Sequence, residues 1–183
     1  MREVARLAKA GSFDHLIVES TGISEPMPVA ETFEMVVPGL DELSGIARLD
    51  TMVTVVDAVN FGSDMDALEA LVDRGWGRDD GDERPVSALL TDQVEFADVL
   101  VLNKTDLVSE AQLARIEGIL RGLNPGALVC RSVLGRVSPG MVIGSGRFSL
   151  ERARQVSRRE CRRHGRHPSL PARTPSGRTP ARP

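Results

Sequence analysis

An uninterrupted apolar run over residues 99–102 (Val-Leu-Val-Leu) leads directly into the polar tetrad Asn-Lys-Thr-Asp at 103–106. A continuous apolar run that ends in a polar turn is typical of a strand buried in a parallel sheet. The carboxyl ends of such strands form the edge at which open α/β sheets bind their ligands. The stretch therefore predicts an α/β fold with a binding site beside residues 103–106.

The tetrad has the form Asn-Lys-x-Asp, which suits a guanine base. A carboxylate at Asp106 can accept hydrogen bonds from both the N1–H and the exocyclic amino group of guanine, and adenine lacks this pair of donors. The amide of Asn103 can bond to the other edge of the base and brace the loop, and the aliphatic stem of Lys104 can lie along the base plane. The alternative is a strand end followed by an ordinary polar turn. The apolar strand before the tetrad and the capped helix after it favour the guanine site.

A second strand is predicted over residues 13–18 (Phe-Asp-His-Leu-Ile-Val), and it is followed by Glu19, Ser20, Thr21 and Gly22. Phosphate-binding α/β proteins place the carboxylate that holds Mg²⁺, directly or through water, at the end of such a strand. Gly22 can offer its backbone N–H to a terminal phosphate at close approach, and the neighbouring hydroxyl groups add further polar contacts. The alternative is a polar turn that leads into a capped helix.

Two more strands are expected. The β-branched run at residues 51–56 predicts a central strand, and Asp57 follows at its carboxyl end. Asp57 either contacts the metal or the switch network, or caps the following turn, and the sequence does not separate these alternatives. Residues 127–130 predict the next strand, in which Cys130 is expected to be a buried structural thiol.

Apolar residues at helical spacing predict helices between the strands. A short helix over residues 2–10 is closed by Gly11, and Ser109 with Gln112 forms a capping box at the start of a later helix. The apolar faces comprise Val29, Phe33 and Val36; Leu68, Leu71 and Val72; Val86, Leu89, Leu90, Val94 and Ala97; and Leu113, Ile116, Leu120 and Leu123. Because strands alternate with helices, we predict a parallel sheet with helices on both faces.

Composition separates residues 1–150, the predicted nucleotide-binding domain, from residues 151–183. The latter are rich in Arg and Pro with few apolar residues, so we expect a disordered tail. A basic arm for nucleic acid or acidic lipid is one interpretation of this tail. We favour a shifted reading frame, because GC-rich DNA read out of frame often encodes Arg and Pro and because residues 156–183 contain no aromatic side chain for base stacking.

The chain has no apolar run long enough to span a membrane and no signal-peptide apolar core at its first residues. Its two cysteines, Cys130 and Cys161, form neither a disulfide framework nor a metal-ligand pair. We therefore expect a cytoplasmic protein without a membrane partner.

Taken together, the motifs resemble the G3E group of P-loop GTPases, specifically the CobW-like metallochaperones of cobalamin and zinc homeostasis (the CobW/HypB/UreG nucleotide-binding domain). The resemblance covers roughly residues 1–150, and an acidic loop at 75–84 together with the Ile-Ser-Glu-Pro wording is most similar to the zinc-linked branch. The runs that carry it are Glu-Ser-Thr-Gly-Ile-Ser-Glu-Pro at 19–26, Leu-Asp-Thr-Met-Val-Thr-Val-Val-Asp-Ala-Val-Asn at 49–60, Asp-Gln-Val-Glu-Phe-Ala-Asp at 92–98, Asn-Lys-Thr-Asp at 103–106 and Leu-Asn-Pro-Gly-Ala at 123–127.

The resemblance implies a domain that binds GTP with Mg²⁺ and couples GTP hydrolysis to the delivery of Zn²⁺, or of Co²⁺, to a client metalloprotein. Asn103, Lys104 and Asp106 would read guanine. Glu19 would belong to the Mg²⁺ and switch region, and Gly22 would lie near the γ-phosphate, so these two are the candidate catalytic residues. Ser20, Thr21 and Asp57 are the other candidate nucleotide contacts. A homo-oligomer remains open, and no nucleic-acid partner is expected.

Two family features are absent from this sequence. There is no Gly-x-x-x-x-Gly-Lys-Ser/Thr run, since the only lysines are Lys9 and Lys104, and there is no Cys-x-Cys-Cys motif for a transported metal. We therefore expect a GTPase-type fold that lacks its first, phosphate-loop strand, and little or no hydrolysis by this chain alone. The alternatives are a non-catalytic fragment that binds a partner through an exposed sheet edge, and a nucleic-acid binder that uses the basic tail.

Overall fold

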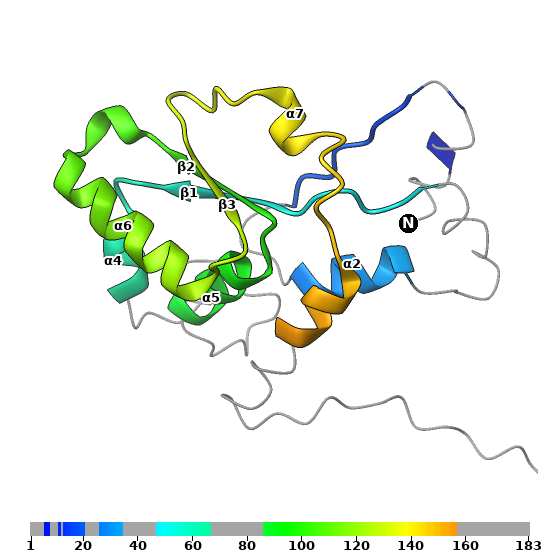
Figure 1. The fold of residues 1–183 in the computed structure, drawn as a ribbon, viewed down its shortest axis with the longest axis horizontal. Coiled ribbons are helices and arrows are strands. Elements are labelled where there is room, and N and C mark those ends of the chain that lie inside the picture. Colours follow the sequence, from blue (N-terminus) through cyan, green and yellow to red (C-terminus); the bar gives the residue numbers. More distant parts are fainter. Residues whose placement is uncertain are drawn as a thin grey trace, which may run out of the picture.

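The three strands that the structure describes form one parallel sheet. In this computed structural model, the described residues are 6–7, 11, 13–20, 26–34, 47–66 and 86–156. The sheet has the order β1-β2-β3 (Figure 1). Its strands are β1 (Val53–Asp57), β2 (Val99–Asn103) and β3 (Leu128–Arg131). Both strand pairs are parallel, with Val53 opposite Val99 and Val99 opposite Leu128.

Helices connect the strands as the sequence pattern predicts. They are α2 (Pro26–Glu34), α4 (Phe61–Asp66), α5 (Val86–Phe96), the 3₁₀ turn η1 (Thr105–Leu107), α6 (Glu110–Leu123) and α7 (Pro139–Val142), and residues 150–156 are mostly helical as well. Figure 1 places α4, α5 and α6 along one face of the sheet and α7 on the opposite side. This arrangement confirms the predicted parallel α/β fold.

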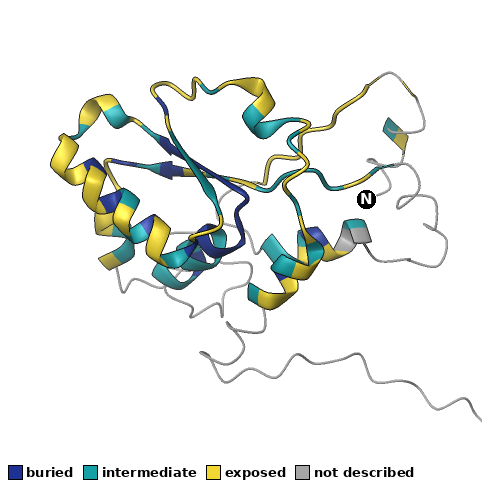
Figure 2. Ribbon diagram, viewed as in Figure 1, coloured by how far each residue is buried: buried dark blue, intermediate teal, exposed yellow. Residues whose placement is uncertain are grey.

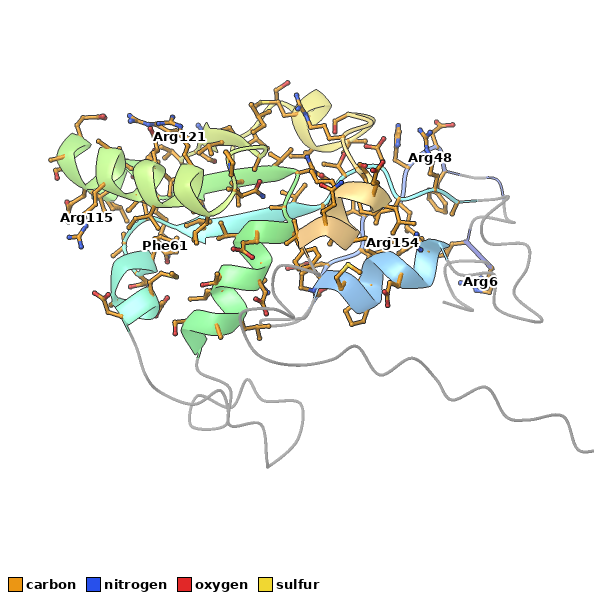
Figure 3. The ribbon with its side chains drawn as sticks, turned by 60° about the horizontal axis from the view of Figure 1, so that its bottom comes forward. Arg6, Arg48, Phe61, Arg115, Arg121 and Arg154 are labelled. Atoms are coloured by element: carbon orange, nitrogen blue, oxygen red, sulfur yellow. The ribbon has the colours of Figure 1, made fainter. Side chains whose placement is uncertain are left out.

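The aliphatic core lies between the sheet and helices α4, α5 and α6. Leu100 and Leu102 of β2 are fully buried, and Phe61 at the start of α4 packs against the same cluster (Figures 2 and 3). The core comprises Val56, Ala58, Phe61, Val94, Ala97, Leu100, Leu102, Leu113, Ile116 and Leu120. The predicted apolar faces of α5 and α6 supply Val94, Leu113, Ile116 and Leu120 of this cluster, so the periodicity identified those faces correctly.

The predicted caps and turns of the helices agree with the structure where it describes them. Ser109 and Gln112 form the reciprocal capping box at the start of α6, and Pro26 is the first residue of α2. Gly11 has φ 63°, the left-handed conformation expected of a residue that ends a helix. The predicted helix at 68–72, the acidic loop at 75–84 and the tail beyond residue 156 lie outside the described residues.

Two strand predictions need correction. The 51–56 run forms β1, but among the described strands β1 lies at the edge of the sheet and β2 at its centre. Residues 13–18 form no strand and do not join the sheet, and Ile17 is 74% exposed. Figure 1 shows this segment beside the amino-terminal side of the sheet, where no described strand is available to pair with its backbone. A sequence pattern indicates that a segment can form a strand, but a strand also requires a neighbour for its N–H and C=O groups.

The buried amide of Asn124 ties the end of α6 to the connection between α5 and β2. Its Nδ2 lies 2.8 Å from the carbonyl oxygen of Val94 and 2.9 Å from those of Glu95 and Ala97. The backbone N–H of Asn124 also donates to the carbonyl of Leu120, at 2.8 Å. A single polar side chain therefore fixes the conformation of the connection between α5 and the central strand β2.

The carboxylate of Asp98 makes a second tie, at the start of β2. It is buried, accepts a hydrogen bond from the backbone N–H of Met52 at 2.7 Å, and forms an ion pair with Arg152. These contacts join the beginnings of β1 and β2 to the helical residues 150–156.

We expect Asn124→Ala to lower the free energy of unfolding by roughly 2–3 kcal/mol, because the substitution leaves buried carbonyl groups without their donor. Urea denaturation followed by circular dichroism measures the change. The matched control is Gln155→Ala, which removes an exposed amide and should change stability by less than about 0.5 kcal/mol. Equal effects of the two substitutions would contradict the role given to Asn124.

Candidate functional site

The candidate site begins where β1 and β2 end side by side. Asp57 and Asn103 are the last residues of these strands and are paired in the parallel register. Immediately after β2, Lys104 adopts the left-handed conformation, with φ 61° and ψ 34°. The N–H of Leu107 donates to the carbonyl of Lys104 at 3.1 Å, which closes the η1 turn. This turn presents Asp106 at the surface.

Asp57 is held by four hydrogen bonds. Its Oδ1 accepts from the backbone N–H groups of Val59 and Asn60, at 2.9 and 3.4 Å. Its Oδ2 accepts from the side-chain amide of Asn60 at 2.9 Å and from Lys104 Nζ at 2.7 Å. Asp57 therefore caps the turn that leads into α4 and also anchors the ammonium group of Lys104.

These contacts account for the protonation behaviour of Asp57. Partial burial alone would raise the pKa of its carboxyl group. The hydrogen bond from Lys104, the two backbone N–H donors and the positive charge of Lys104 outweigh that effect, so the pKa lies below its usual value. Asp57 is therefore ionised at neutral pH and paired with Lys104.

Asn103 and Thr105 are braced by the loop that follows β3. The Oδ1 atom of Asn103 accepts from the N–H of Gly135 at 3.0 Å, and its backbone carbonyl accepts from the N–H of Ala58 at 3.0 Å. The N–H and Oγ1 of Thr105 both donate to the carbonyl of Ser132, at 3.2 and 3.1 Å. The tetrad is therefore supported by residues from all three strand ends.

The carboxylate of Asp106 has a different environment. It is exposed, and within the described part of the chain no residue forms a hydrogen bond or ion pair with it. Its two oxygen atoms can therefore accept the pair of donors on a guanine edge. The Nδ2 of Asn103 is likewise without a protein acceptor among the described residues and can donate to a ligand.

A sequence profile of the CobW/HypB/UreG nucleotide-binding domain matches residues 1–131. The chain belongs to this family. A relative from Dictyostelium discoideum, zinc-regulated GTPase metalloprotein activator 1, is 44% identical over 152 residues, which are 82% of this chain and 32% of that protein. The zinc chaperone CobW of Pseudomonas aeruginosa is 31% identical over 132 residues, which are 70% of this chain and 33% of that protein.

A solved structure supports the same fold. The crystal structure of the Zn(II)-bound YjiA GTPase from E. coli aligns with a TM-score of 0.57 and 25% identity, covering 80% of this chain and 39% of that one. This CobW-family chain spans about a third of the length of the curated relatives named above.

The remaining predicted site residues lie elsewhere or outside the described part. Glu19 and Ser20 are exposed at the end of the 13–20 segment, which Figure 1 shows on the amino-terminal side of the sheet, away from the ends of β1 and β2. Thr21 and Gly22 lie outside the described residues. The structure thus brings Asp57 together with the Asn-Lys-x-Asp residues and does not bring Glu19 and Ser20 to them.

The loop at 132–135 is the part of the site that sequence reasoning missed. Ser132 is buried, while Leu134 and Gly135 both have positive φ, at 53° and 69°. The sequence feature that could have revealed this loop is a polar residue and a glycine shortly after β3, at the same edge of the sheet as the tetrad.

Metal-ligating side chains do not gather in the described ranges: no three His, Cys, Asp or Glu residues there could hold one ion. Cys130 is half-buried rather than fully buried, because β3 lies at the other edge of the described three-stranded sheet. Its burial raises the pKa of the thiol, which keeps it protonated. In the same ranges, none of the helices has the length and apolar character needed to cross a bilayer.

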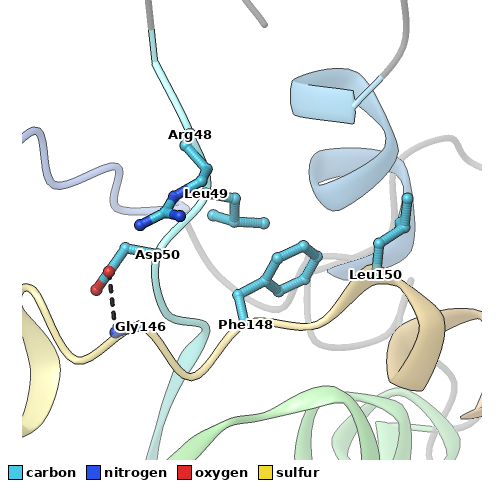
Figure 4. A pocket seen from close by; sticks show the side chains of 6 residues that line it. All are labelled: Arg48, Leu49, Asp50, Gly146, Phe148 and Leu150. Carbon is cyan, nitrogen blue, oxygen red and sulfur yellow. Dashed lines mark hydrogen bonds between the residues drawn. The ribbon is translucent and has the colours of Figure 1, made fainter.

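A separate small hollow lies before the amino-terminal end of β1, between residues 48–50 and the segment at 146–150 (Figure 4). Its carboxylate, Asp50, is engaged by Thr51 Oγ1 at 2.7 Å and by the N–H groups of Ser145 and Gly146, at 2.9 and 3.0 Å. The hydrogen bond from Thr51 is the main cause of the lowered pKa of Asp50. These contacts hold the turn at residues 145–146 against the residues that precede β1. Asp50 therefore has a structural role.

We expect the contribution of Asp57 to stability to depend on pH. Since its folded-state pKa is lowered, this contribution is present at neutral pH and is lost as the pH falls below about 4. Asp57→Asn should therefore lower the free energy of unfolding by up to about 1 kcal/mol at pH 7, since the paired side chains are partly exposed.

Urea denaturation at several pH values from neutral to acidic measures this difference. The gap between wild type and Asp57→Asn should close at the acidic end. The control is Asp66→Asn, which removes a negative charge from an exposed position of α4. A gap that stays constant down to the lowest pH would contradict the assignment.

Proposed function

We propose that this chain supplies guanine recognition in a GTP-dependent zinc metallochaperone of the CobW family. The observation that carries the proposal is the exposed carboxylate of Asp106, which has no partner among the described residues and is set at the carboxyl edge of the sheet by the turn that Lys104 begins. That edge is the ligand-binding edge of open α/β sheets.

Each residue of the tetrad has a distinct role in this proposal. Asp106 accepts the N1–H and the exocyclic N–H of guanine through charge-assisted hydrogen bonds, which are stronger than neutral ones. Asn103 donates from Nδ2 to the opposite edge of the base while its Oδ1 remains bonded to Gly135. Lys104 lays its aliphatic stem along the base, and its ammonium group stays on Asp57.

The proposal also concerns the activity of the whole protein to which this chain belongs. The names of the relatives, a zinc-regulated GTPase metalloprotein activator and a zinc chaperone, support GTP hydrolysis coupled to delivery of zinc to a client metalloprotein. A cytoplasmic location stays a prediction. Cobalt delivery and the role of Glu19 and Gly22 around Mg²⁺ and the γ-phosphate stay predictions.

We propose in addition that this chain alone turns over little GTP. Phosphoryl transfer depends on positioning the phosphates and neutralising their charge, and a Gly-x-x-x-x-Gly-Lys loop usually provides both. Such a run does not occur among the 183 residues, in which Lys104 is committed to Asp57 and Lys9 follows no glycine in this pattern.

Asp106→Asn tests guanine recognition. We expect GDP to bind roughly 10- to 100-fold more weakly, because the carboxylate loses one of the two acceptor positions for the base. Xanthosine diphosphate should bind more tightly to the variant than to wild type, because the new amide N–H can donate to the 2-oxo group of xanthine. Isothermal titration calorimetry with GDP, ADP and xanthosine diphosphate measures both effects.

The matched control is Glu151→Gln, which removes an exposed carboxylate from the helical residues 150–156 and should leave GDP binding unchanged. The proposal would be wrong if ADP bound wild type as well as GDP does, or if Asp106→Asn left the preference for GDP over xanthosine diphosphate intact.

A further inference from the structure

Arg131, the last residue of β3, bridges two carboxylates of α6. Its Nη1 donates to both oxygen atoms of Glu110, at 3.0 and 2.8 Å, and its Nε donates to Glu117 Oε1 at 2.6 Å. Glu110 and Glu117 are about two helical turns apart and therefore lie on the same side of α6. One guanidinium group thus holds the end of β3 against this helix.

The contact with Glu110 closes a ring around the candidate guanine site. One side of the ring runs from Asn103 through η1 to Glu110, and the other side runs from Arg131 through the following loop to Gly135. The Arg131–Glu110 ion pair, at 2.8 Å, closes one end of the ring. The N–H of Gly135, which donates to Asn103 Oδ1 at 3.0 Å, closes the other end. The two segments that form the site are therefore fixed to each other at both ends.

The loop that follows Arg131 has a backbone conformation that needs support from its surroundings. Leu134 has φ 53°, a left-handed conformation that is unfavourable for leucine. Such a residue keeps its conformation only where the surrounding structure fixes it. Ser132 supplies part of this support, because it is buried and its carbonyl accepts from the N–H and Oγ1 of Thr105, at 3.2 and 3.1 Å. Arg131 directly precedes Ser132 and fixes the loop from the side of α6.

We propose that Arg131 is a positioning residue for guanine binding, an inference that rests on the guanine site proposed above. By pairing with α6, Arg131 holds the loop at 132–135 against the tetrad. The bond from Gly135 to Asn103 Oδ1 turns the Nδ2 of that amide toward the ligand, so a loop displaced from the tetrad would release the amide. Arg131 therefore acts through the loop and not by contact with the base.

The competing interpretation is that Arg131 makes ordinary surface ion pairs. Its partner Glu110 is exposed, and an isolated exposed pair contributes little to stability. The side chain of Glu117, however, is only 14% exposed, and the hydrogen bond from Arg131 is the main cause of its lowered pKa. The planar guanidinium group also contacts both carboxylates at once, which the single ammonium group of a lysine does not reproduce. We therefore expect the effect of Arg131 to be confined to the loop that it holds.

Amide hydrogen exchange of the chain without a ligand tests whether Arg131 holds the loop. In Arg131→Met, which keeps an apolar stem and removes the guanidinium group, the amides of Thr105 and Gly135 should exchange roughly three- to fivefold faster, since the local contacts open more often. The amides of Leu100 and Leu102 in the buried strand β2 should keep their wild-type rates. Unchanged exchange at Thr105 and Gly135, or faster exchange at all four amides, would contradict the proposal.

The matched control is Arg121→Met, which removes the same group from the last turn of α6 (Figure 3). Arg121 pairs with Glu117 Oε2 at 3.3 Å, so this substitution breaks an ion pair within the helix and leaves the contact between Glu117 and Arg131 in place. Exchange at Thr105 and Gly135 should therefore stay at the wild-type rate. Equal effects of the two substitutions would contradict the role given to Arg131.

Titration with GMP, followed by the amide signals of residues 103–106, tests the consequence for binding. Arg131→Met should bind GMP roughly two- to fivefold more weakly than wild type, because the apparent affinity falls with the fraction of molecules whose loop is in place. Adding Glu110→Gln to Arg131→Met should cause no further loss, since the two side chains form one contact. A further loss equal to that of Glu110→Gln alone would contradict the proposal.

The GMP titration separates a failure of this inference from a failure of the proposed function. If wild type gives no GMP-dependent shift, the proposed function is wrong and the role of Arg131 in guanine binding is wrong with it. If wild type binds GMP and Arg131→Met binds it equally well, the proposed function stands and the inference about Arg131 is wrong.

Discussion

The in-register pairing of β1 with β2 is the constraint on which the site depends. It places Asp57 beside Asn103 at the carboxyl edge, so that Lys104, the next residue of the chain, can reach the Asp57 carboxylate at 2.7 Å. A shift of the register by one residue would send these side chains to the opposite face of the sheet. The buried contacts of Asn124 and Asp98 fix the connections into these strands, and therefore contribute to the site from a distance.

Local chemistry made much of the fold predictable. The apolar run at 99–102 became the buried central strand, and the periodicity of α5 and α6 identified the faces that cover it. The Ser109 capping box marked the start of α6. For Asp57 the sequence left capping and metal contact open, because a carboxylate at a strand end suits both. Four hydrogen bonds from protein donors make it a cap of the turn into α4, and its contact with a metal or nucleotide stays a prediction.

Features that depend on residues far apart in the sequence could not be predicted from it. The run at 51–56 has the composition of a central strand, but its position at an edge depends on which other strands are present. Residues 13–18 have strand composition and no partner in the described sheet. The support that Ser132 and Gly135 give to the tetrad could not be read from spacing, because it arises only when β3 pairs beside β2.

We propose that the tetrad and residues 132–135 form a preorganised site that binds guanine without a contact to the phosphates. Nuclear magnetic resonance titration of the ¹⁵N-labelled chain with GMP, and separately with AMP, tests it most directly. We predict that GMP shifts the amide signals of residues 103–106 and 132–135 and that AMP leaves them in place. If GMP produced no change at these residues, or AMP produced the same change, the account would be contradicted.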